Sequence, residues 1–84
     1  MRKITDKWLF VIDNDGYQIK AVSGDAVKDF GHVITDSFSS SLKGVIYKAE
    51  QYYLHYYRAL LCDVQVVGSE GDYSLIGRIR FVER

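Results

Sequence analysis

The chain contains no proline and a single cysteine, Cys62, among its 84 residues. One cysteine excludes an internal disulfide and a cysteine-based zinc site, and it is typical of a protein of the reducing cytoplasm. Basic and acidic side chains number 11 each, so no net charge draws the protein toward nucleic acid or an anionic membrane. Any electrostatic binding must therefore depend on a local patch.

Long hydrophobic runs are also missing. The apolar run at residues 8–12 is too short for a signal peptide and is followed at once by acidic residues. No other segment reaches the length of a membrane-spanning helix. The composition, 48% hydrophobic and 26% charged, is typical of a folded domain and not of a disordered tail. We expect one small domain over residues 1–84 that is cytoplasmic and has no membrane contact.

Alternating side chains predict two β-hairpins. Near the N-terminus, the aromatic and β-branched residues 8–12 precede the turn-forming sequence DNDG, and residues 17–22 then alternate between two faces. A third strand is expected at residues 32–35. Near the C-terminus, residues 64–67 include three valines, and residues 73–82 alternate after the loop sequence GSEGD. Arg78 and Arg80 occupy the polar face of this last strand.

The segment between the hairpins predicts one main helix. Residues 36–41 carry side-chain oxygens that accept hydrogen bonds from the free amides of a helix start. At about 100° per residue, one arc of the helix is apolar and is expected to face the core. The helix end stays open, because residues 60–67 can continue the helix or begin a strand. The arc consists of Phe38, Leu42, Val45, Ala49, Tyr52, Tyr53, Tyr56 and Leu60.

The expected order of elements is three strands, one helix and two strands, or βββαββ. This order predicts a small α+β domain with an antiparallel sheet of about five strands and the helix packed on one face. No repeat or linker divides the chain.

No sequence motif indicates an enzyme, a metal site or a cofactor site. The sequence DNDG lacks the third oxygen ligand and the glutamate of a calcium loop, and GSEGD lacks the lysine of a phosphate-binding loop and the hydroxyl residue that follows that lysine. His32 and His55 have no second ligand or nucleophile at a diagnostic spacing. Cys62 follows two leucines and is expected to pack as a small apolar group. We therefore expect a non-enzymatic protein without a metal or cofactor.

The helix face opposite the apolar arc is the best candidate for a partner-binding site. Aromatic and basic residues gather there with almost no acid nearby, and tyrosine and arginine often dominate interface energetics. The other interpretations of this face are a solvated surface, a surface covered by the C-terminal hairpin, and a homodimer interface. The expected contact residues are Lys43, Tyr47, Gln51, Leu54, His55 and Arg58.

A basic surface offers an alternative function. Arg78 and Arg80 on the last strand, with Lys43, Arg58 and exposed tyrosines, are the residue types that bind phosphates and stack bases. Alternating arginine and apolar residues are equally typical of the solvent face of an edge strand. The alternative is thus a small nucleic-acid-binding domain.

From the aromatic strand and its turn through SFSSSLKGVIYKAEQYY, the chain resembles small accessory proteins encoded by phages and prophages, among them proteins of the anti-CRISPR type. The resemblance covers about half the chain and concerns size and organisation. It implies a compact inhibitor that occupies a functional surface of a host defence complex. Since the chain is neutral and not acidic, such an inhibitor would bind by protein contact and not by imitating phosphates.

Overall fold

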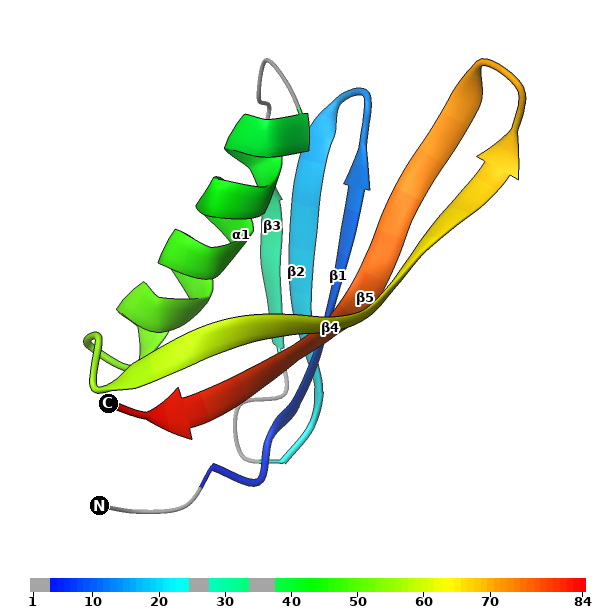
Figure 1. Ribbon diagram of the computed structural model, residues 1–84. Coiled ribbons are helices and arrows are strands. Elements are labelled where there is room, and N and C mark those ends of the chain that lie inside the picture. The colour runs from blue at the N-terminus through cyan, green and yellow to red at the C-terminus, as the bar shows by residue number, and fades with distance from the viewer. Residues whose placement is uncertain (1–3, 25–27, 34–37) are drawn as a thin grey trace.

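Figure 1 shows the protein as a computed structural model, which describes residues 4–24, 28–33 and 38–84. Within these residues the strands form one antiparallel sheet in the order β3-β2-β1-β5-β4, and the helix packs on one face of it. The expected α+β class, with one helix across an antiparallel sheet, is confirmed. The elements are β1 (Lys7–Asp13), β2 (Gly16–Ser23), β3 (Lys28–Val33), α1 (Phe38–Tyr52), β4 (Tyr57–Ser69) and β5 (Asp72–Glu83).

The predicted N-terminal hairpin is confirmed by β1 and β2. The Asp13 carboxylate accepts a hydrogen bond from the Asp15 amide at 2.8 Å, which stabilises the turn. Gly16 has a φ of 132°, a conformation that residues with a side chain rarely adopt. The two faces of β2 also follow the prediction, because Tyr17, Ile19 and Ala21 are buried whereas Gln18, Lys20 and Val22 are exposed.

The core lies between α1 and the sheet. Val45 and Ala49 of α1 are completely buried against the sheet residues. Gly44 allows this close packing, because a Cβ atom at its position would lie only 2.6 Å from Cε1 of Tyr17. Burial of each large apolar side chain contributes roughly 1.5–3 kcal/mol, so this layer supplies most of the stability. Strands β1 and β2 contribute Trp8, Phe10, Ile12, Tyr17, Ile19 and Ala21, and the last two strands contribute Ala59 and Ile79.

The third strand starts earlier than the sequence predicts. It spans Lys28–Val33, and Lys28 is the register partner of Ala21. Pairing with β2 therefore recruits residues 28–31, which show no clear alternation of their own. The remainder of the predicted strand, residues 34 and 35, and the predicted helix start at residues 36 and 37 lie outside the described residues.

The helix ends at Tyr52, before the apolar arc of the sequence ends. Leu54 and His55 adopt left-handed backbone conformations, with φ angles of 55° and 61°. The His55 amide donates to the carbonyl oxygen of Glu50 at 2.8 Å, and the Leu54 amide donates to that of Gln51 at 2.9 Å. These two bonds form a Schellman motif, which pairs the last helix carbonyls and reverses the chain.

The prediction that Tyr56 and Leu60 lie on the helix is therefore wrong. Tyr56 belongs to the turn after the helix and is exposed, and Leu60 lies on β4 and is also exposed. Helical periodicity continued the arc through these positions because it registers only the spacing of apolar residues, whereas the chain reverses at Leu54 and His55.

The last hairpin extends beyond the helix as a projecting arm, which we define as residues 63–73. Figure 1 shows this hairpin arm leaving the rest of the sheet and pointing away from α1. It starts at a β-bulge, where β4 has two residues between the register pairs Cys62–Arg78 and Gln65–Ile76. Every residue of the hairpin arm is exposed, and the molecule measures 44 × 21 × 20 Å.

Candidate binding surfaces

The end of α1 displays most of the predicted contact residues. Lys43, Tyr47 and Gln51 are exposed on one face of the helix, at a spacing of about one turn. Tyr47 is 59% exposed, and its ring centroid lies 5.6 Å from that of His55. Leu54 is 73% exposed. We define the helix-end corner as Tyr47, Gln51, Leu54, His55 and the exposed Tyr56.

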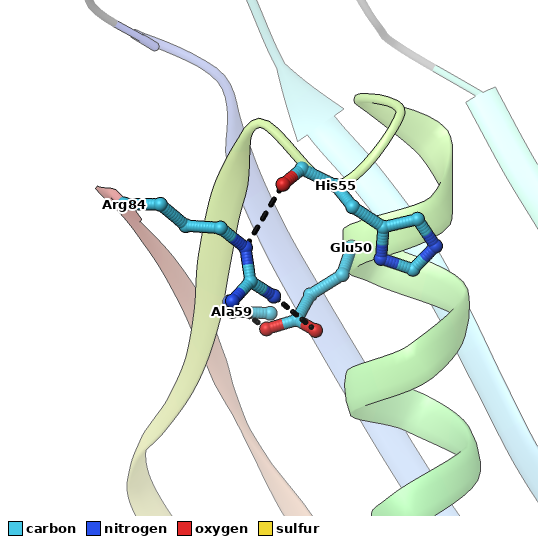
Figure 2. Close-up of polar contacts among 4 residues, drawn as sticks. All are labelled: Glu50, His55, Ala59 and Arg84. Carbon is cyan, nitrogen blue, oxygen red and sulfur yellow. Dashed lines mark hydrogen bonds and ion pairs between the residues drawn. The ribbon is translucent and has the colours of Figure 1, made fainter.

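A cluster of polar contacts fixes the backbone of this corner (Figure 2). One carboxylate oxygen of Glu50 accepts a hydrogen bond from the Ala59 amide at 2.8 Å, and the other forms an ion pair with the Arg84 guanidinium at 3.1 Å. Arg84 also donates to the carbonyl oxygen of His55 at 2.9 Å. The cluster thus joins α1, the turn, β4 and the residue after β5.

Sequence reasoning missed the role of Glu50. The sequence does set Glu50 apart, because it is the only acid among residues 42–61, in a segment rich in tyrosine. Its partner Arg84 follows by 34 positions, and no local pattern connects the two. Arg84 is therefore engaged at the helix-end corner and does not extend the row formed by Arg78 and Arg80.

An aromatic cluster of the core lies next to the helix-end corner. The Tyr53 hydroxyl donates a hydrogen bond to the Asp6 carboxylate. Burial, together with this hydrogen bond, raises the pKa of the Tyr53 phenol well above its usual range. Its ring lies 4.9 Å from that of Phe81 and 5.8 Å from that of Trp8, measured between centroids. Tyr53 is thus a core tyrosine with its hydroxyl at the rim.

The backbone at Leu54 is energetically unfavourable for the residue that occupies it. A left-handed conformation costs a residue with a Cβ atom roughly 1–2 kcal/mol, and glycine is the usual occupant of this position in a Schellman motif. The leucine side chain gains little burial in return, since 73% of its surface stays exposed. Strain of this kind is concentrated at binding and catalytic sites.

The structure separates Arg58 from the other predicted contact residues. Arg58 lies on β4 between Tyr57 and Ala59, which are both buried toward α1. Because successive side chains of a strand point to opposite faces, Arg58 faces away from the helix. The prediction that Arg58 lies on the contact helix is wrong, and Leu54 and His55 belong to the turn and not to the helix.

The sheet face that α1 leaves uncovered is basic. Arg58, Arg78 and Arg80 share this face, whereas Lys43 lies on the helix side. Arg78 forms an ion pair with Asp63 at the bulge, so part of its charge is neutralised. Cys62 is half-buried on this face beside Arg78. Exposed Lys7 and Lys20 add two further positive charges.

Among the described residues, no cluster of three or more histidine, cysteine or acidic side chains is placed to hold a metal ion. No helix in that part of the chain is long and apolar enough to cross a membrane. In comparisons with known proteins, no family model, no characterised protein and no solved structure matches the chain. The helix-end corner and the basic sheet face are therefore the two candidate binding surfaces of the described residues.

Proposed function

We propose that the protein is a non-enzymatic protein-binding module that contacts its partner through the helix-end corner. The observation that carries this proposal is Leu54, a large apolar side chain that is 73% exposed on a left-handed backbone. Folding alone favours glycine at this position, because glycine removes the steric cost and little burial would be lost. A leucine there is explained by a contact that the free chain does not contain.

The neighbours of Leu54 support the same role. Tyr47 and His55 form an exposed ring pair beside it, and aromatic side chains supply large contact areas at low conformational cost. The contacts of Glu50 with Ala59 and Arg84 hold the turn in one geometry. A corner that is already ordered loses less conformational entropy on binding than a flexible loop does.

The partner we propose is a host protein complex, which the chain inhibits in the cytoplasm by covering a functional surface. This extends the resemblance to phage accessory proteins of the anti-CRISPR type. The corner fits a protein surface better than a phosphate-binding one, because it exposes two tyrosines and a leucine and contains no lysine or arginine. The neighbouring acid, Glu50, is paired with Arg84. Binding should therefore depend mainly on apolar contact and only weakly on salt.

The test is recovery of partners from host lysate by tagged protein, with and without nuclease. We expect one protein to be retained in near-stoichiometric amount after nuclease treatment, and to be lost with Leu54→Gly or Tyr47→Ala. Truncation of a contact residue of this kind costs about 2 kcal/mol or more. Glu70→Ala, at the exposed tip of the hairpin arm, is the matched control and should retain the partner. Retention by Leu54→Gly and Tyr47→Ala alike would contradict the proposal.

A second candidate function is nucleic-acid binding by the uncovered sheet face. It is favoured by the exposed Arg58, Arg80, Lys7 and Lys20 on one surface. Such binding would weaken steeply with salt, because each neutralised phosphate releases counterions. Arg80→Ala should then lower the salt dependence as well as the affinity for an oligonucleotide, whereas Leu54→Gly should change neither. Binding that is independent of salt, or is unaffected by Arg80→Ala, would exclude this candidate.

A further inference from the structure

Strand β4 is an edge strand over its whole length. It stands last in the strand order, so within the described residues its outer side has no neighbouring strand. Only alternate residues of an antiparallel strand bond to a given neighbour, which leaves a row of amide and carbonyl groups directed outward. Natural proteins usually protect such an edge with charges, proline or a covering segment, because it readily pairs with another strand.

Beyond Asp63, the part of β4 in the hairpin arm lacks these protections. The six residues 64–69 have the sequence VQVVGS, with no charge and no proline. All six are exposed, and Val66 is 64% exposed. Valine favours strand pairing, and a short uncharged segment of this kind is typical of strands that associate edge to edge. The bulge at Asp63 lies at the base of the hairpin arm and leaves this segment accessible.

The charges at the two ends of β4 indicate which strand fits. The tip carries Glu70 and Asp72, whereas the part of the hairpin before the bulge carries Arg58 and, opposite Leu60, Arg80. A second β4 running antiparallel places the acidic tip of one copy beside the arginines of the other. A parallel arrangement would instead bring like charges together. The edge is therefore complementary to itself in the antiparallel direction.

We propose that two copies of the chain associate through their hairpin arms, with the β4 strands paired antiparallel about a twofold axis near Val66. Residues 64–68 of each copy pair across the axis, and the two sheets become one continuous sheet. With the axis at Val66, Glu70 of one copy lies beside Cys62 of the other, next to Arg78 and Arg80 on the neighbouring β5. The helix-end corners lie outside the paired segments, so the dimer can present both of them to partners.

The first test is the molar mass in solution, measured by light scattering and sedimentation over a range of concentrations. We expect a concentration-dependent species of twice the 9.7 kDa chain mass. Val66→Lys should return it to the monomer, because two lysines would meet at the axis. Leu54→Lys places the same charge at an equally exposed apolar position in the helix-end corner and should leave the dimer intact. Circular dichroism checks that both variants are folded.

Cross-linking tests the same arrangement without disrupting it. In a Cys62→Ser background, Val66→Cys should form an intermolecular disulfide under mild oxidation, whereas Leu54→Cys should not. A chain that stays monomeric at the highest concentrations overturns the proposal, as does a dimer that Leu54→Lys disperses and Val66→Lys does not. Equal cross-linking through positions 54 and 66 also overturns it. None of these results bears on partner binding by the helix-end corner, which the lysate experiment tests separately.

Discussion

The helix-covered half of the sheet and the hairpin arm are both built of antiparallel strands, but they differ in whether their apolar side chains are buried. Val45 of α1 packs against β1 and β2 and is 0% exposed, whereas Val66 of the hairpin arm is 64% exposed. In the first region, apolar side chains are removed from water and stabilise the fold. In the second, strand pairing alone maintains the hairpin, and a two-stranded hairpin by itself is at best marginally stable. Apolar residues in the hairpin arm are therefore available for binding.

The largest expected difference between the two regions comes from removing an aromatic ring in each. Phe10→Ala should lower the free energy of unfolding by about 3–5 kcal/mol, because it opens a cavity in the core. Tyr73→Ala in the hairpin arm should cost less than about 1 kcal/mol. Urea denaturation followed by tryptophan fluorescence measures both. Equal losses would show that the hairpin arm is packed against the core.

The polar cluster at the helix end should give the next largest effect. Glu50→Ala leaves the Ala59 amide without its acceptor and should cost about 1–3 kcal/mol. Glu50→Gln keeps an acceptor oxygen and loses only the ion pair with Arg84, so its cost should be smaller. Glu70→Ala in the hairpin arm should stay within about 0.5 kcal/mol of the parent. Thermal denaturation measures the stability of the three variants. If Glu50→Gln and Glu50→Ala lose equal stability, the ion pair with Arg84 is the main stabilising contact of Glu50.

Leu54→Gly should separate stability from binding at the helix-end corner. Glycine removes the steric cost of the left-handed backbone, so the free energy of unfolding should rise by about 1 kcal/mol. Partner binding should fall in the same variant, because the exposed leucine side chain is gone. Chemical denaturation and a binding titration measure the two quantities. A loss of stability would mean that the leucine side chain contributes to folding more than its exposure indicates.

The smallest expected effect is a loss of stability at alkaline pH. The folded-state pKa of Tyr53 lies above its unfolded value, so its contribution is complete below about pH 10 and is lost as the pH rises through the folded pKa. Burial also raises the pKa of Tyr17, which adds an effect of the same sign. Tyr53→Phe should flatten the decrease in stability above pH 10. An unchanged slope in this variant would contradict a role for the Tyr53–Asp6 contact.

Local alternation predicted the hairpins and their faces well. The buried and exposed residues of β2 and the two faces of β5 followed from period-two patterning, because each strand has one face against the core and one toward water. The exposed face with Lys43, Tyr47 and Gln51 followed in the same way from helical periodicity. Helical periodicity did not predict the position of Arg58, because β4 begins only after the chain reverses at Leu54 and His55. Neither of these residues is a glycine, so the sequence contains no turn signal there.

The amino-acid sequence by itself determined the α+β class, the turn at DNDG and the side of each strand that meets the core, because these depend on neighbours in the chain. Only the tertiary structure decided where α1 ends, how Glu50 and Arg84 hold the helix-end corner, and which half of the last hairpin remains uncovered. The physical reason is that a periodic pattern specifies which face of an element is apolar. What packs against that face depends on the position of elements distant in the chain, and the hairpin arm points away from α1.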